Sequence, residues 1–271
     1  MKKLTLLLLA LLYVTLTYAY TERDLLQKQA DINRLKEILV LDRQWVTYPD
    51  YNDRAGWDRF LGTFKDEYIR RGEKRLNYQW QVVKATDYLA FERTGNRQIM
   101  EKPFGANNGA IADLLMAELA EGKGRFVDQL INGVFNACEM TSWALAAHII
   151  VQPSHRALPA YDYPVIDLTS GDLGGLLAWT YHFMRPSFDK VDPEISRRLR
   201  HELQTRILDP YMNNDSFWWM GRNYNGRMLN NWNPWCNSNA LMCFMLLEDN
   251  RDTLAKAVHL TMESVDKFLN Y

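Results

Sequence analysis

Apolar residues recur at the spacing of an α-helix along most of this chain, and almost no segment has the strict alternation of a half-buried β-strand. The helical repeat is evident from Leu25 to Leu39 and again over 57–69, 78–91, 108–121 and 126–151. Glycine or proline residues stand near the ends of most of these stretches, where helices commonly stop. The pattern therefore predicts an all-α protein.

Four more helices are expected over 170–184, 193–208, 236–247 and 253–269. The first of these is apolar on almost every face, which indicates a buried helix, and Pro186 is expected to end it. Helices of similar length joined by short turns favour antiparallel helical hairpins. An α/α toroid fits this pattern, and so does an irregular bundle. No fixed-period repeat supports a helical solenoid.

The N-terminus has the pattern of an export signal. Two lysines precede an apolar run from Leu4 to Leu16, and the small residues that a signal peptidase requires follow at 17–19. The run is shorter than the roughly 20 residues that span a bilayer. We expect a cleaved signal peptide over 1–19 and a single domain over 20–271, with no membrane span after cleavage and a periplasmic or secreted location.

Charge and cysteine content restrict the partners and the cofactors. Thirty-two Lys and Arg residues face 33 Asp and Glu residues, a formal charge of −1, so no overall positive field attracts nucleic acid. Cys236 and Cys243 would lie about 10 Å apart along one helix, too far for a disulfide. We expect these residues and Cys138 to be small buried side chains. No Cys/His spacing indicates a metal site, and no cofactor is predicted.

Asparagine and tryptophan are interleaved over 230–239, at the end of a loop that is expected over 212–235. Asparagine caps helices and adopts turn conformations, so a tight, well-capped loop is one interpretation of any single residue. The cluster also favours a second interpretation. Amide donors at a helix N-terminus can bind an anion, and indole faces can stack on sugar rings. Together they are typical of a carbohydrate subsite.

Another informative stretch runs from Cys138 to Trp143. Glu139 and Trp143 are four residues apart and would share one face of a helix. Glu139 either faces a cleft or is a buried structural hydrogen-bonding group. His148 lies among alanine and isoleucine residues, and we interpret it as a core histidine with satisfied hydrogen bonds. We interpret the segment before Asp167 as a loop that enters a capped helix, and the alternative is that Asp167 orients a partner by a hydrogen bond.

The chain resembles the heparinase II/III-like polysaccharide lyases from about Trp57 onwards. The likeness rests on the motifs at 138–143, 166–168, 217–219 and 231–237. The most specific of these motifs is Asn-Trp-Asn-Pro-Trp-Cys-Asn at 231–237. The resemblance implies an α/α toroid, followed in complete family members by a β-sandwich domain.

The resemblance also implies cleavage of uronate-containing polysaccharides by β-elimination. An amide or neutral acid stabilises the charge that develops when the C5 proton leaves, and a Tyr or His moves the protons. Carried onto this chain, the amide role falls on Asn231, which we favour, or on Asn233. The expected substrate-binding residues are Glu139, Trp143, Arg222, Trp232, Trp235 and Asn237.

Family members carry their catalytic tyrosine and their β-sandwich beyond the point that corresponds to Tyr271. We therefore expect an N-terminal part of a lyase that acts on an acidic polysaccharide and is inactive alone, with an incomplete toroid. Two alternatives stay open. One is a non-catalytic carbohydrate-binding or scaffold protein of the cell envelope. The other is a toroid glycoside hydrolase, for which Glu139 and Asp215 are the carboxylate pair to test.

Overall fold

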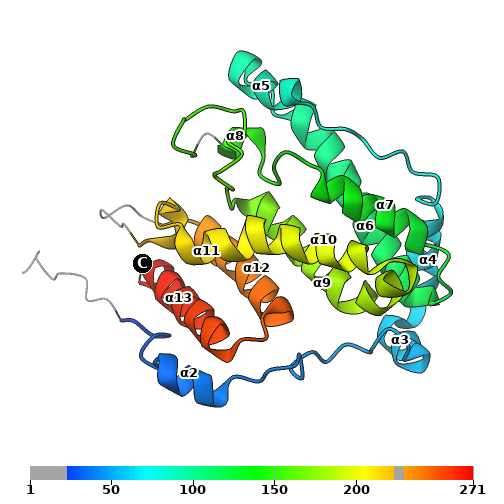
Figure 1. Cartoon of the computed structure of the whole chain (residues 1–271), viewed down its shortest axis with the longest axis horizontal. Coiled ribbons are helices and arrows are strands. Elements are labelled where there is room, and N and C mark those ends of the chain that lie inside the picture. The colour runs from blue at the N-terminus through cyan, green and yellow to red at the C-terminus, as the bar shows by residue number, and fades with distance from the viewer. Residues whose placement is uncertain (1–22, 150, 223–228, 271) are drawn as a thin grey trace, which may run out of the picture.

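The computed structural model describes residues 23–149, 151–222 and 229–270. Within these ranges the fold consists of helices and connecting loops, and no strand occurs (Figure 1). The prediction of an all-α protein is thus confirmed. No helix in the same ranges is long and apolar enough to cross a membrane. The predicted export signal over 1–19 lies outside the described residues.

The elements follow one another along the chain with short connections. The longer helices are α2 (Ile32–Ile38), α3 (Arg54–Leu61), α4 (Lys65–Glu73), α5 (Ala85–Thr94), α6 (Gln98–Glu121), α7 (Val127–Cys138), α9 (Leu168–Val191), α10 (Pro193–Leu203), α12 (Trp232–Leu247) and α13 (Arg251–Leu269). Shorter elements are η1 (Gly62–Phe64), α8 (Ala146–Ile149), the π-helical η2 (Gln204–Leu208), α11 (Asp209–Asn213) and η3 (Trp218–Met220).

The helices pack in two groups that share one hydrophobic core. In the first group, α6 contacts α3, α4, α5 and α7. In the second, α9 packs against α10 and α12, and α12 packs against α13. Contacts of α7 with α9 and α10 join the groups (Figure 1). Helices that follow one another in the chain contact each other in pairs, such as α6 with α7, α9 with α10 and α12 with α13.

The N-terminal segment is anchored to the last helix. The backbone N–H groups of Leu26 and Gln27 donate to the buried Asp266 carboxylate on α13, both at 2.9 Å. The backbone N–H of Arg23 donates to the Asn270 side chain at 2.8 Å. The helical repeat expected over 25–39 is therefore realised only as a turn followed by the short α2.

Three predicted helix starts are wrong, because α5 begins at Ala85 and not at residue 78, α6 at Gln98 and not at residue 108, and α12 at Trp232 and not at residue 236.

Two predicted helix ends are also wrong, and both have a clear physical cause. The helix expected over 170–184 does not stop at Pro186, because α9 continues to Val191. Pro186 itself is exposed, whereas Met184 and Phe188 on either side of it are fully buried. Burial of these side chains outweighs the single backbone hydrogen bond that proline removes from the helix.

The second correction concerns the long helix expected over 126–151, which ends at Cys138. The Arg206 guanidinium donates to the carbonyls of Met140 (2.8 Å) and Cys138 (3.3 Å). The Trp143 indole N–H donates to the Ala137 carbonyl at 2.8 Å. These donors satisfy carbonyls that have no partner inside the helix, so the chain can turn here.

All three cysteines are buried and free, as predicted. Burial raises the pKa of the Cys138 and Cys243 thiols to about 12, so both stay protonated at neutral pH. Cys243 lies where α12 crosses the glycines of α9, and a Cβ added at Gly174 would come within 3.6 Å of its sulfur. The cysteines therefore act as small packing residues.

Substitution of Gly72 tests the contact between α4 and α6. An alanine methyl group there would overlap the Ala117 side chain, which cannot rotate away. We expect Gly72→Ala to lower the free energy of unfolding by about 1–3 kcal/mol. Gly105 in α6 is the matched control, because its added methyl group meets no atom within 4 Å.

Gly105→Ala removes a flexible residue from a helix interior, so it should raise the free energy of unfolding by about 0.5–1 kcal/mol. Urea unfolding followed by circular dichroism measures both variants. Equal effects of the two substitutions would contradict the close approach of α4 to α6.

Candidate functional site

A buried carboxylate organises the start of α9. Asp167 is fully buried and is the N-cap of this helix. Its Oδ1 accepts the Ser170 backbone N–H at 2.7 Å, and the Ser170 hydroxyl accepts the Asp167 backbone N–H at 2.7 Å. This reciprocal pair is a capping box, which fixes the position of the carboxylate.

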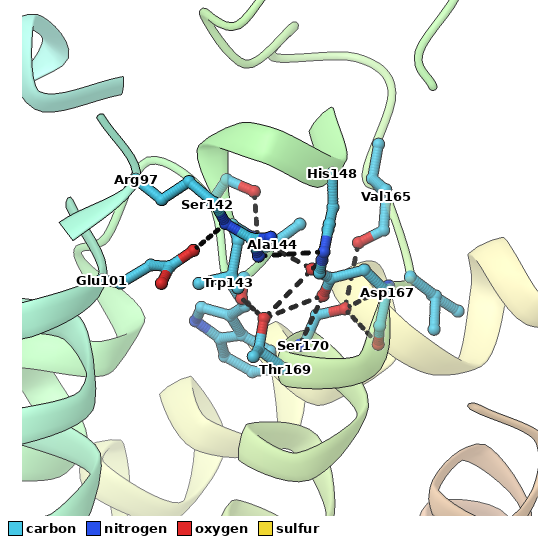
Figure 2. A network of polar contacts seen from close by, with 12 residues as sticks. Arg97, Glu101, Ser142, Trp143, Ala144, His148, Val165, Asp167, Thr169 and Ser170 are labelled. Atoms are coloured by element: carbon cyan, nitrogen blue, oxygen red, sulfur yellow. Dashed lines mark hydrogen bonds and ion pairs between the residues drawn. The ribbon is translucent and has the colours of Figure 1, made fainter. Parts of the chain in front are cut away.

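The other oxygen of Asp167 holds the loop before α8 and the histidine within it. Oδ2 accepts the Leu145 backbone N–H at 3.1 Å and lies 2.6 Å from Nδ1 of His148 (Figure 2). The Thr169 hydroxyl also donates to this carboxylate, at 3.1 Å. Four donors from the protein compensate the cost of burying the carboxylate. Asp167 therefore caps α9 and also orients a partner, which is His148.

His148 is a satisfied histidine, but it lies at the edge of the core, with 15% of its side chain exposed. Because the Asp167 oxygen is an acceptor, Nδ1 carries the proton and the lone pair of Nε2 points away from Asp167. Nε2 lies 3.3 Å from Nη2 of Arg97, whose Nε donates to Glu101 at 2.6 Å (Figure 2). Both residues come from the start of α6. The site thus combines a proton acceptor with an adjacent cation.

The asparagine–tryptophan segment meets this histidine through Trp232. The His148 and Trp232 rings contact edge-to-face, with centroids 4.7 Å apart. Trp232 also lies against the half-exposed Trp218, with centroids 5.4 Å apart. The tertiary structure therefore brings the end of the 138–148 stretch and the start of α12 to one place, although their sequence positions are far apart.

Asn231, the residue favoured for the amide role, lies next to this contact and is exposed. It occupies the N-cap position of α12, but its side chain does not cap the helix. Asn230 does so instead, because its Oδ1 accepts the Trp232 backbone N–H at 3.0 Å. The Asn231 amide therefore forms no hydrogen bond with the described residues, and it directly precedes Trp232 in the chain.

Asn233 and Asn237 point the other way, into the core, and both are fully buried. The Asn233 amide donates to the Trp219 carbonyl (2.7 Å) and the Ser264 carbonyl (2.9 Å). The Asn237 amide donates to the Ser264 hydroxyl at 2.8 Å, and its oxygen accepts the Tyr211 hydroxyl at 2.6 Å. These two asparagines join α12 to α13, η3 and α11, and they have no access to a ligand in this structure.

Trp235 lies one helical turn beyond Asn231 and is 44% exposed. Its indole N–H donates to Oδ1 of Asp172 on α9 at 2.6 Å, and the Asn239 amide donates to the same oxygen at 2.9 Å. The ring is thus fixed in orientation while part of its surface stays open. Trp235 is suited to a stacking contact near Asn231.

The other predicted substrate-binding residues lie in separate environments. Glu139 is exposed and pairs with Arg198 of α10 at 3.1 Å. Trp143 is 2% exposed, and the Arg206 guanidinium lies 5.2 Å from its ring centroid. Arg222 pairs with the exposed Asp215. Because α7 ends before Glu139, this residue and Trp143 do not share a helix face, which corrects that prediction.

A pocket of about 160 Å³ adjoins the network of hydrogen bonds around Asp167 and His148. Trp143, Ser142 and Ser170 line it, together with Arg206 and the buried Glu202. Trp143 is thus the predicted site residue that faces this pocket, although little of its surface is open. In the part of the chain that the structure describes, no group of three metal-ligating side chains comes together.

The sequence did not indicate that Arg97 belongs to this site or that one edge of the His148 ring is exposed. The His148–Asp167 pair spans 19 residues and belongs to no spacing motif, and Arg97 lies 51 residues before His148. The one usable signal was Asp167 at the start of a helix. A carboxylate at that position has one oxygen for the cap and one for a second partner.

Two comparisons with known proteins found no match for this chain. The chain matches no protein-family model, and no curated protein sequence matches it.

The opposite orientations of Asn231 and Asn233 give a direct test. Asn233→Ala removes the donors that satisfy the buried carbonyls of Trp219 and Ser264, so it should lower the free energy of unfolding by about 2–3 kcal/mol. Asn231→Ala removes an exposed amide and should change it by less than about 0.5 kcal/mol. Thermal and urea unfolding of both proteins provide the measurement. The reverse order of effects would contradict the placement of these side chains.

Proposed function

We propose that this protein is the helical part of a polysaccharide lyase that binds a uronate-containing polysaccharide and cleaves it by β-elimination. The observation that carries the proposal is the contact between His148, held by the buried Asp167, and Trp232 of the asparagine–tryptophan segment. This contact gathers a proton acceptor, an exposed amide and indole surfaces, which are the groups that the resemblance to heparinase II/III-like lyases requires.

In the proposed reaction the C5–H bond of a uronate breaks, and the proton moves to Nε2 of His148. Asp167 keeps the other ring nitrogen protonated and supports the imidazolium that forms. The electron pair passes into the C4–C5 bond as the bond from C4 to the glycosidic oxygen breaks. The proton held on Nε2 of His148 then passes to the leaving oxygen, which returns the imidazole to its neutral form. The other product carries the C4–C5 double bond as an unsaturated uronate at its chain end. General-base help of this kind typically contributes 10²–10⁴-fold.

Two groups are suited to stabilise the negative charge that spreads into the uronate carboxylate during the reaction. The Asn231 amide can donate a hydrogen bond to it, and the Arg97 guanidinium can pair with it. Arg97 donates to Nε2 of His148 in the free protein, and its side chain is 47% exposed. A substrate carboxylate would draw Arg97 away from His148 and so free Nε2 for the proton.

The aromatic side chains supply surface for the sugar rings. Trp218 and Trp235 are 39% and 44% exposed, and both lie beside α12 and its N-terminal residue. Indole faces stack on the apolar faces of pyranose rings without requiring one particular hydroxyl pattern. The proposed substrate therefore crosses the N-terminal end of α12, with its acidic group at Asn231.

The two alternatives have less support from the geometry. In a hydrolase, Glu139 and Asp215 would act as a carboxylate pair, but each is already paired with a different arginine, Arg198 and Arg222. A non-catalytic binding protein needs the tryptophans and Asn231, but it has no need for a histidine oriented by a buried carboxylate. The lyase proposal uses both features.

Binding to this chain tests the substrate class. A uronate tetrasaccharide should bind with a Kd in the micromolar-to-millimolar range, and Asn231→Ala should weaken it about tenfold because a charge-assisted hydrogen bond is lost. Calorimetry against a neutral tetrasaccharide of the same linkage is the control, and that sugar should bind more weakly. Equal binding of the two sugars, or no binding at all, would contradict the proposal.

Turnover tests the roles of the two residues. In the full-length protein, Asn231→Ala and His148→Asn should each lower turnover by about 10²-fold or more. The amide that the second substitution introduces can still donate to Asp167 in place of Nδ1, so only the proton acceptor is lost. Ultraviolet absorbance of the unsaturated product reports the rate.

His259→Asn is the matched control for turnover, because His259 pairs with Glu263 on the same helix and contacts none of the proposed groups. It should leave turnover unchanged. Rates within a factor of about three of wild type for both Asn231→Ala and His148→Asn would remove these residues from the reaction.

A further inference from the structure

A polar groove lies along the hairpin of α9 and α10. The residues that line it take no part in the proposed lyase site. The two helices are joined through Asp192 and pack side by side (Figure 1). Arg185 and Asp189 on α9 face Ser196 and Arg200 on α10 across a cavity of about 440 Å³. This volume is in the range of small-molecule sites.

Ser196 gives the first indication of a ligand. The residue is only 4% exposed, and its Oγ forms no hydrogen bond with any described residue. A buried hydroxyl is normally paired, and a helical serine can donate to the carbonyl four residues earlier. Ser196 does not do so. Ser196 lines the groove, and its buried hydroxyl is a donor without an acceptor.

Arg200 gives the second indication. Its Nη1 donates to Oε1 of Gln204 at 2.7 Å, and it pairs with no carboxylate among the described residues. The other arginines of the groove do have such partners, since Arg185 lies 3.4 Å from Asp189 and Arg197 pairs with Glu194. The groove therefore holds one cation whose charge is not balanced locally, on the same wall as the unpaired hydroxyl.

Asp189 gives the third indication, and it is a hydrogen-bond acceptor, whereas Ser196 and Arg200 are donors. Its Oδ2 is the atom near Arg185, whereas its Oδ1 is buried and accepts no hydrogen bond within the described ranges. One wall of the groove thus offers donors, and the other offers an acceptor. A simple anion would satisfy the donors and repel the acceptor. A molecule that carries both an acidic group and a hydroxyl group would satisfy both walls.

We propose that this groove binds a hydroxylated acid of the size of one hexuronate residue. The acidic group accepts hydrogen bonds from Ser196 and Arg200, and a ring hydroxyl donates to Oδ1 of Asp189. Tyr181, which also lines the groove, offers an aromatic face beside the ring. The groove shares no residue with the His148 site, so this inference does not depend on elimination chemistry.

Ligand-observed NMR titration with D-glucuronate tests the inference. The titrations use the Asn231→Ala protein as background, so that the lyase site makes little contribution. We expect a Kd on the order of 1 mM for a ligand of this size. Arg200→Met should raise the Kd about tenfold or more, and Ser196→Ala should raise it about fivefold. Arg70→Met, a change at an exposed arginine of α4, should leave it unchanged.

D-glucose and inorganic sulfate are the comparison ligands. Glucose lacks the acid and sulfate lacks a ring hydroxyl, so each should bind at least about fivefold more weakly than glucuronate. Ser196→Ala removes no protein hydrogen bond, and its Tm should be unchanged or raised, which separates loss of binding from loss of folding.

Three results would overturn the inference. They are the absence of glucuronate binding, an unchanged Kd in both Arg200→Met and Ser196→Ala, and sulfate binding as tight as that of glucuronate. The last would indicate a simple oxyanion site. None of them bears on the lyase proposal, which is tested at Asn231 and His148.

Discussion

The buried carboxylate of Asp167 is the interaction on which the proposed site depends. A charge with no solvent exposure is tolerated only when several donors surround it. The Ser170 backbone, the Leu145 backbone and the His148 ring are among those donors, and they come from α9 and from the segment that contains α8. One side chain therefore caps a helix, fixes a loop and orients a histidine. Loss of any of these contacts would leave the carboxylate short of a partner.

Buried amides have a similar organising role at the N-terminal end of α12. Asn233 and Asn237 connect this helix to α13, η3 and α11, and Ser264 of α13 is their shared partner. The Tyr211 hydroxyl of α11 donates to Asn237. Burial raises the pKa of Tyr211, so its hydroxyl stays a neutral donor. The asparagine–tryptophan segment is therefore both structural and exposed. One side of its first turns is fixed in the core, and this rigidity positions Asn231 and Trp235 on the other side.

The two proposed acid-binding surfaces follow from local charge rather than from overall charge. The chain has a net charge of −1, so neither surface benefits from a global attraction for anions. At the His148 site the cation is Arg97, and in the hairpin groove it is Arg200. Each proposal pairs this cation with a neutral donor, Asn231 in the first and Ser196 in the second. One cation and one neutral donor suit one carboxylate group at a time.

The sequence by itself determined the all-α class, the positions of most helices and the burial of the cysteines, because helical periodicity and apolar content are local properties. It also indicated Asp167, since a cap residue can be recognised from its neighbours. Only the tertiary structure decided that α7 ends at Cys138, because the arginine that satisfies the carbonyls there, Arg206, belongs to η2. It alone decided which asparagines face solvent and that His148 meets Trp232. These outcomes depend on hydrogen bonds and ring contacts between distant segments, and local periodicity carries no information about such contacts.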